Sequence, residues 1–254
     1  MDQDIRPKHK GFYILPNLLT TASLFSGFLG MLWAIEGRFE HCAIAILVSC
    51  LFDGMDGKVA RLTKASSDFG VQFDSLADLS SFGISPAVMV YLWQTHKFGR
   101  IGLVVSFLLV ACGALRLARF NVQAKELPKK FFIGLPIPAA ACTLATLVLF
   151  SEYIPKNWVE PVLPKVALIL TFVLALAMVS RIKYASFKEV EVVKAHPFTT
   201  TVSIIMLFVL VASEPKLLGF LFFIGYLLSG LIYTFLILPL RNSSKLREPR
   251  KELS

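Results

Sequence analysis

The chain has 254 residues, of which 56% are hydrophobic, and its mean hydropathy is +0.67. These values exclude a water-soluble globular domain, and the recurring uncharged runs predict a helical protein that crosses a bilayer several times. The net charge of +9 raises the question of nucleic acid as a partner. The basic residues, however, form short clusters between the apolar runs, as membrane anchors do, so we expect no nucleic acid.

The order of polar and apolar segments predicts an all-α integral membrane protein with about eight transmembrane helices. Residues 1–17 are basic and aromatic, and we expect them to form a short segment at the membrane interface. The expected spans are residues 18–35, 41–62, 74–93, 101–118, 132–150, 162–180, 199–211 and 217–238. A basic tail follows at residues 241–254, and the absence of a clear linker predicts a single transmembrane domain over residues 1–254.

The distribution of basic residues predicts which way this domain faces. An even number of spans places both termini on one side of the membrane. With these spans, 20 Lys and Arg residues fall on the terminal side and 6 fall on the other side. Because basic residues accumulate in cytoplasmic loops, we expect both termini in the cytoplasm.

The second expected span ends in an acidic stretch. Asp53, Asp56, Gly57 and Ala60 are spaced i, i+3, i+4 and i+7, so on a helix they form one stripe. The small residues keep this face of the helix flat, which allows a ligand to approach the backbone closely. Carboxylates beside a membrane are costly and usually serve a function.

The third expected span begins with a second acidic stripe, because Asp74 and Asp78 follow Gly70 at successive steps of four residues. The four aspartates of the two stripes supply hard oxygen ligands with no Cys or His nearby, which favours Mg²⁺ or Mn²⁺ over zinc or copper. Two such ions would form a clamp suited to a pyrophosphate. The orientation derived above places this site at the cytoplasmic face.

The aspartates have two other interpretations. Some of them could only cap helices or pair with Lys58, Arg61 or Lys64. A divalent-cation transporter would also use acidic residues in the membrane, but it predicts carboxylates at a comparable depth in other spans. The remaining spans are almost free of carboxylates, so the sequence favours an enzyme.

The spacing D-x-x-D-G-x-x-A-R-x8-G-x3-D-x3-D resembles the motif of the CDP-alcohol phosphotransferases, which are integral membrane enzymes. The positions that match are Asp53, Asp56, Gly57, Ala60, Arg61, Gly70, Asp74 and Asp78. The resemblance implies that the four aspartates hold two divalent ions, Mg²⁺ or Mn²⁺, which bind the pyrophosphate of a CDP-linked donor. It also implies that Gly57, Ala60 and Gly70 line the cytidine pocket, that Arg61 contacts phosphate, and that Asp78 is the general base.

Further segments are similar to the membrane-embedded phosphatidylserine synthases of bacteria and archaea. These segments are L-P-N-L-L-T at 15–20, S-S-F-G-I-S-P-A at 80–87, A-L-R-L-A-R-F-N at 114–121 and F-I-G-L-P-I-P-A-A-A at 132–141. This resemblance implies CDP-diacylglycerol and L-serine as substrates, a homodimer, and a location in the cytoplasmic membrane of a prokaryote. The alternative acceptor is glycerol 3-phosphate, but enzymes of that branch typically have a lysine after the last aspartate, where this chain has Leu79.

Four polar residues outside the acidic stretch are further candidates for substrate contacts. Arg116 and Arg119 lie near the cytoplasmic end of the fourth expected span and could contact the serine carboxylate or the donor phosphate. An equally good explanation is that they reach toward the membrane surface without binding substrate. Asn17 and Thr20 could touch the donor, although helix capping explains Asn17 almost as well.

Overall fold

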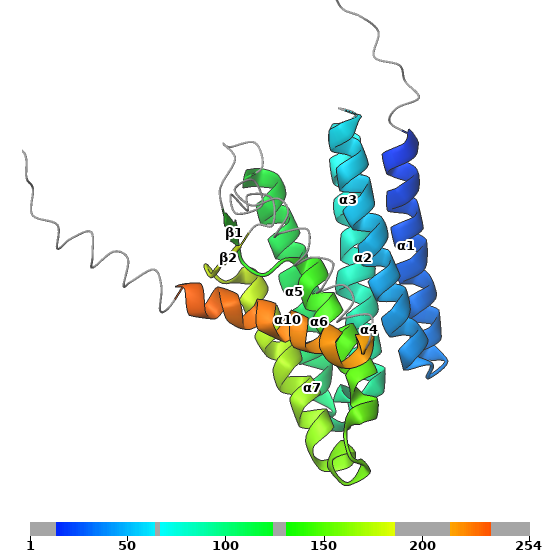
Figure 1. Ribbon diagram of the computed structural model, residues 1–254, viewed down its shortest axis with the longest axis vertical. Coiled ribbons are helices and arrows are strands. Elements are labelled where there is room, and N and C mark those ends of the chain that lie inside the picture. Colours follow the sequence, from blue (N-terminus) through cyan, green and yellow to red (C-terminus); the bar gives the residue numbers. More distant parts are fainter. Residues whose placement is uncertain (1–13, 64–66, 124–130, 186–213, 235–254) are drawn as a thin grey trace, which may run out of the picture.

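The structure is a computed structural model that describes residues 14–63, 67–123, 131–185 and 214–234. Most of the described chain is helical, and the long helices run side by side in a bundle (Figure 1). The helices are α1 (Ile14–Ile35), α2 (Phe39–Leu62), α3 (Asp68–Asp78), α4 (Ser85–Trp93), α5 (Arg100–Gln123), α6 (Ile137–Phe150), α7 (Lys156–Val179) and α10 (Pro215–Ile232). The expected interfacial segment up to residue 13, the expected span at 199–211 and the basic tail lie outside the described residues.

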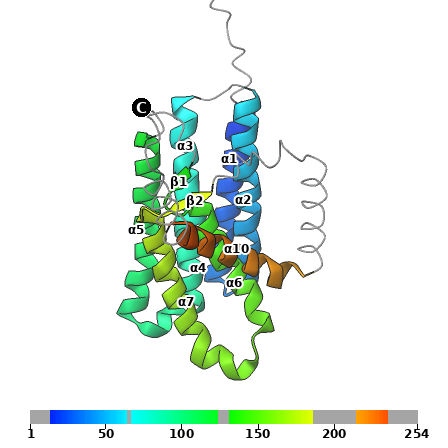
Figure 2. The ribbon, with the colours of Figure 1, turned by 60° about the vertical axis from the view of Figure 1, so that its left-hand side comes forward.

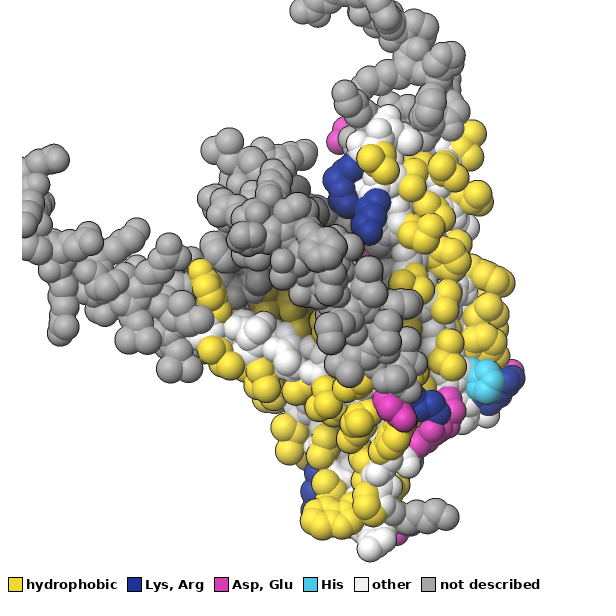
Figure 3. Space-filling view, in the orientation of Figure 1, with side chains coloured by type: hydrophobic (Ala, Val, Ile, Leu, Met, Phe, Trp, Pro, Cys, Tyr) yellow, Lys and Arg dark blue, Asp and Glu magenta, His cyan; other side chains and the backbone are white. Residues whose placement is uncertain are grey.

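Five stretches of the described chain are long and apolar enough to cross a membrane, which confirms a helical membrane protein. They are Ile14–Ile35, Asp68–Trp93, Arg100–Val122, Asn157–Val179 and Pro215–Ile232. Large apolar side chains, including Ile14, Leu18, Phe25 and Leu32, are exposed along α1. Figure 3 shows the same flank covered with hydrophobic atoms, as expected for a surface that faces lipid.

Small and hydroxyl-bearing residues join α1 to α2. The hydroxyls of Ser23 and Ser49 lie 2.7 Å apart, and Ser26 donates a hydrogen bond of 2.8 Å to the carbonyl of Ala45. A Cβ at Gly30 would lie 3.3 Å from the Cβ of Ala45. Close helix contacts made by small residues are typical of membrane bundles, and here they fix α2, which carries two of the aspartates, against α1.

The expected third span is one continuous helical stretch made of two α-helices with a π-helical turn between them. It begins at Asp68 rather than at residue 74, because Ser67 caps the helix by accepting a hydrogen bond of 3.0 Å from the backbone N–H of Gly70. The π-helical turn covers Leu79–Ile84 and separates α3 from α4. It packs on α1, where a Cβ at Gly27 would lie 2.7 Å from the Cα of Ser81.

The expected fifth span starts later than the sequence suggested. Residues Phe131–Ile133 form strand β1, which pairs antiparallel with strand β2 (Lys183–Ala185). Gly134 then turns with φ +83, and α6 begins at Ile137 with a proline in its first turn. A residue with positive φ and two prolines cannot continue a helix upstream, so the span is shortened at its N-terminal end.

Helix α10 lies across the bundle rather than along it, as both ribbon views show (Figures 1 and 2). It packs against α6 and β2, and the rings of Phe150 and Phe220 stack with centroids 4.9 Å apart. At its N-terminal end, Tyr153 donates a hydrogen bond of 2.6 Å to Glu214, and Lys216 pairs with Glu152. The expected last span is therefore a helix from Pro215 to Ile232, but its direction differs from that of its neighbours.

Candidate metal and nucleotide site

The C-terminal half of α2 and the N-terminal part of α3 meet at one end of the bundle (Figures 1 and 2). The N-terminus of α1 and the C-terminus of α5 lie at the same end. Figure 3 shows Lys and Arg side chains where α2 and α3 meet.

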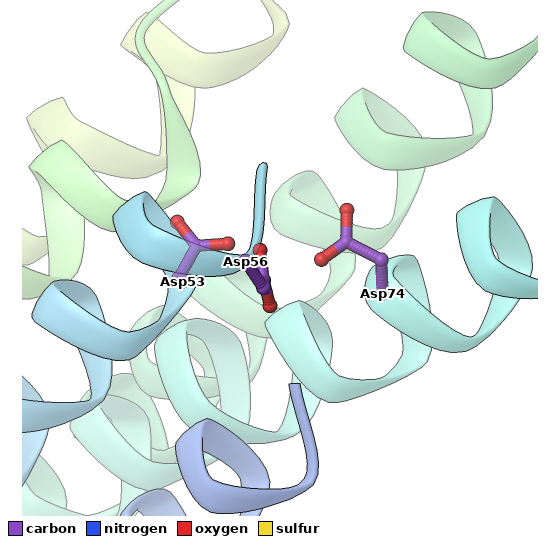
Figure 4. Close-up of side chains that lie close together, drawn as sticks. All are labelled: Asp53, Asp56 and Asp74. Carbon is purple, nitrogen blue, oxygen red and sulfur yellow. The ribbon is translucent and has the colours of Figure 1, made fainter. Parts of the chain in front are cut away.

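Three aspartates converge at this end of the bundle. Asp53 and Asp56 project from α2, and Asp74 projects from α3 toward them (Figure 4). One carboxylate oxygen of each residue lies within 4.8 Å of the others. Asp56 is buried, whereas Asp53 and Asp74 are partly exposed. We refer to Asp53, Asp56 and Asp74 as the aspartate cluster.

Asp78 lies one helical turn beyond Asp74 and is influenced electrostatically by all three residues of the aspartate cluster. Its carboxyl group lies near that of Asp53, but it is not among the three carboxylates whose oxygens lie within 4.8 Å of one another. Asp78 is the last residue of α3, so the π-helical turn starts immediately after it. Turns of this kind occur often at functional sites, because they change the direction of side chains within a helix.

The chemistry of the aspartate cluster fits a divalent cation. Three carboxylates at this separation repel one another strongly when they are partly removed from water, and a cation offsets that repulsion. The donors are all oxygen atoms, which suit Mg²⁺, Mn²⁺ or Ca²⁺ better than softer metals. The residues present can therefore hold a hard divalent ion.

A cavity of about 100 Å³ opens beside the aspartate cluster. Helices α1, α2 and α3 all contribute to its wall, which consists of Pro16, Asn17, Thr20, Asp56, Gly57, Ala60, Ser67, Gly70, Val71 and Asp74. Gly57 and Gly70 matter here because they leave space that a side chain would fill. A Cβ at Gly70 would lie 3.2 Å from the hydroxyl oxygen of Ser67 and 3.5 Å from the amide oxygen of Asn17.

Two further residues connect this cavity to its surroundings. The hydroxyl of Thr20 donates a hydrogen bond of 2.7 Å to Oδ2 of Asp56, which fixes the orientation of that carboxylate. Arg61 is exposed at the rim, where it interacts electrostatically with Asp56, and its Nη1 would be 3.5 Å from a Cβ at Gly57. Arg61 is thus placed to meet an anion that enters between the cavity and the aspartates.

The two candidate arginines on α5 are placed differently. Arg116 interacts electrostatically with Asp78, whereas Arg119 is a partly exposed residue three positions further along. The cavity wall also includes Ser67, which the sequence analysis did not name. Its position two residues before Phe69 in S-S-D-F-G follows the rule for helix N-caps and could have been found from the sequence.

Membrane-spanning helices, a carboxylate cluster at their end and an adjoining cavity define an integral membrane protein with a candidate metal-dependent site. Comparison with known families narrows this class. The sequence profile described as CDP-alcohol phosphatidyltransferase matches residues 13–176. The chain therefore belongs to the CDP-alcohol phosphatidyltransferase family.

Individual relatives show how far this similarity extends. The chain is 41% identical over 179 residues to the CDP-diacylglycerol–serine O-phosphatidyltransferase of Helicobacter pylori, which covers 70% of this chain and 75% of that protein. It is 41% identical over 148 residues to the archaetidylserine synthase of Methanothermobacter thermautotrophicus, covering 58% and 62% of the two chains. A Mycobacterium bovis CDP-diacylglycerol–serine O-phosphatidyltransferase is 33% identical over 150 residues, covering 57% and 52%.

Proposed function

We propose that the chain transfers the phosphatidyl group from CDP-diacylglycerol to the hydroxyl of L-serine, forming phosphatidylserine and releasing CMP. The observation that carries this proposal is the convergence of three carboxylates beside a cavity lined by small residues. Membership of the family supplies the reaction class, and the names of the relatives favour serine over glycerol 3-phosphate. The product lipid remains in the bilayer in which the helices lie.

We assign the donor to the cavity and the aspartate cluster. The small surfaces at Gly57, Ala60 and Gly70 would accept the cytidine, with Asn17 beside it. When bound to Asp53, Asp56, Asp74 and Asp78, two divalent ions, Mg²⁺ or Mn²⁺, would neutralise the pyrophosphate and stabilise the charge on departing CMP. Arg61 would bind phosphate oxygens that remain exposed at the rim.

We assign Asp78 the role of general base. A serine hydroxyl is a poor nucleophile at neutral pH, and a carboxylate within hydrogen-bond reach can accept its proton as it attacks. The hydroxyl oxygen then bonds to the β-phosphorus, and the bond from that phosphorus to the bridging oxygen of CMP breaks. The proximity of Asp78 to Asp53 supports this role, because a base at this position would lie beside the proposed metal ligands.

One assay tests the function and its alternative acceptor. The purified protein in detergent is supplied with CDP-diacylglycerol, Mn²⁺ or Mg²⁺, and labelled L-serine, and we expect labelled phosphatidylserine and CMP in equal amounts. Parallel reactions replace serine by glycerol 3-phosphate. Product formed from glycerol 3-phosphate but not from serine would show that glycerol 3-phosphate is the acceptor. The absence of CMP with both acceptors would contradict the proposed reaction class.

We also propose the topology and assembly that accompany this function. Both termini and the site would face the cytoplasm, because the basic residues are concentrated on that side of the expected spans. Cysteine accessibility measured from each side of membrane vesicles tests this orientation. A homodimer is proposed from the family resemblance, and the mass of the detergent-solubilised protein tests it.

A further inference from the structure

Arg116 on α5 is a half-buried arginine with one side-chain nitrogen that no described residue satisfies. The Nε of Arg116 is buried and finds no hydrogen-bond partner among the residues that the structure describes. A guanidinium remains charged under all ordinary conditions, and a buried donor without an acceptor is costly. Such a group is suited to a ligand that brings its own negative charge.

The neighbours of Arg116 indicate where this ligand would lie. Arg116 interacts electrostatically with Asp78 of α3 and with Tyr226 of α10. Asp78 is the proposed base, so the acceptor hydroxyl must lie against it. In serine, only two carbon atoms separate the hydroxyl oxygen from the carboxylate carbon. A serine whose hydroxyl meets Asp78 therefore extends its carboxylate to an adjacent group.

Helix α10 is fixed in position by a second tyrosine. Tyr184 of β2 has an exposed fraction of 0%, and its ring packs on α10, where a Cβ at Gly230 would lie 2.2 Å from its Cε1. The rings of Tyr184 and Tyr226 have centroids 5.6 Å apart. Burial raises the pKa of Tyr184 to about 12, so its ring stays neutral beside Tyr226. Strand β2 thus packs on the part of α10 that carries Tyr226.

We propose that Arg116 binds the carboxylate of the acceptor serine and that Tyr226 positions the guanidinium for this contact. The proposal rests on the proposed function and extends it to the choice of acceptor. According to this proposal, residues of α5 and α10 determine which acceptor is used. Helix α10 lies beyond residue 176, where the family match ends. A single guanidinium suits the one negative charge of a carboxylate, whereas a phosphate dianion would require more positive charge.

The test compares two acceptors that differ only at the carboxylate, L-serine and L-serinamide. Steady-state rates are measured for the wild type, Arg116→Gln, Arg116→Lys and Tyr226→Phe at saturating CDP-diacylglycerol. For Arg116→Gln we expect kcat/KM for serine to fall about 10- to 100-fold, as for loss of a charged hydrogen bond, and the value for serinamide to stay nearly constant. Arg116→Lys should recover part of the loss. Tyr226→Phe should raise KM for serine while leaving kcat near the wild-type value.

Two further variants control for general effects of removing an arginine from α5. Arg100→Gln, an exposed site at the other end of α5, is the matched control and should behave as wild type. Arg119→Gln tests the competing arginine. The inference is wrong if Arg116→Gln keeps the preference for serine, if it loses both acceptors equally, or if Arg119→Gln removes the preference instead. A wild-type protein that releases no CMP with serine would instead contradict the proposed function itself.

Discussion

The hydroxyl of Thr20 lies 2.7 Å from Oδ2 of Asp56, and this hydrogen bond links α1 to the aspartate cluster on α2 and α3. Both residues are buried, with exposed fractions of 5% each. The hydroxyl therefore holds one carboxylate oxygen of Asp56 and leaves the other available to a metal. Residues that orient metal ligands in this way affect metal affinity without touching the metal.

Replacing Thr20 by Val should weaken the binding of metal by the aspartate cluster. The substitution keeps the shape of the side chain and removes the hydrogen bond to Asp56. We expect the Mn²⁺ or Mg²⁺ concentration for half-maximal rate to rise about 10-fold, as for other partners of metal ligands. Thr21→Val is the control, because the Thr21 hydroxyl is exposed and bonds only to the carbonyl of Asn17 in the described chain. Equal metal dependence in the two variants would contradict this role.

Removing divalent metal should abolish turnover. With EDTA we expect no CMP release, and added Mg²⁺ or Mn²⁺ should restore it, because the cluster consists of oxygen donors. Binding of Mn²⁺, followed by its electron paramagnetic resonance signal, should be lost in Asp56→Ala. Full activity in EDTA would show that the aspartate cluster serves another purpose.

Asp78→Asn should stop the chemical step but leave the binding of CDP-diacylglycerol unchanged. We expect kcat to fall about 10²- to 10⁴-fold, the range for loss of a general base, because an amide cannot accept the proton of serine. Binding of CDP-diacylglycerol, followed by the thermal stabilisation it causes, should persist. Asp68→Asn is the matched control at the exposed start of the same helix. Near-normal turnover by Asp78→Asn would rule out its role as base.

Gly57→Ala should reduce affinity for the donor without harming the fold. The added Cβ would be 3.5 Å from Arg61 Nη1, an ordinary contact, and Ala favours a helix over Gly by up to about 1 kcal/mol. The methyl group would, however, occupy space in the cavity, so we expect KM for CDP-diacylglycerol to rise. Gly54→Ala on the same helix provides the control, because a Cβ there would meet no atom of the other described residues within 4 Å. A shared change in both variants would point to the helix rather than the cavity.

Gly27→Ala should both destabilise the protein and shift the position of Asp78, the proposed base. Its Cβ would lie 2.7 Å from the Cα of Ser81, so α1 and the π-helical turn after Asp78 must separate. We expect about 1–3 kcal/mol of destabilisation, as for other overpacked sites, seen as a lower melting temperature in detergent, together with a reduced kcat. Gly30→Ala is the graded comparison, because its nearest neighbour would be 3.1 Å away at a side-chain oxygen. Equal effects of the two substitutions would contradict the argument.

Hydropathy and spacing predicted much of the fold and the core of the site. The bounds predicted for α1, α2, α5 and α7 lie within about six residues of those observed, because membrane helices must satisfy their backbone internally over a fixed length. The two acidic stripes lie on α2 and α3, and Asp53, Asp56 and Asp74 converge. The local rule of helical spacing was sufficient for this, since each stripe lies within one helix.

Contacts between distant segments could not be predicted in the same way. Nothing in the local sequence indicates that α10 crosses the bundle or that Tyr184 packs on Gly230. The expected fifth span also started at residue 132 instead of Ile137, because the pairing of β1 with the distant β2 and the positive φ of Gly134 are not evident from hydropathy. The π-helical turn escaped prediction because its hydrogen bonding depends on how α1 fits against Ser81.

That π-helical turn has a consequence for how this protein can change. One extra residue in a turn rotates everything beyond it by about 100° relative to a regular helix. The helical repeat of α3, which carries Asp74 and Asp78, therefore does not continue in phase into α4, which packs in the bundle. Mutations can refit one half to its neighbours without turning the other. Within one helix, chemistry and packing can thus diverge separately in the course of evolution.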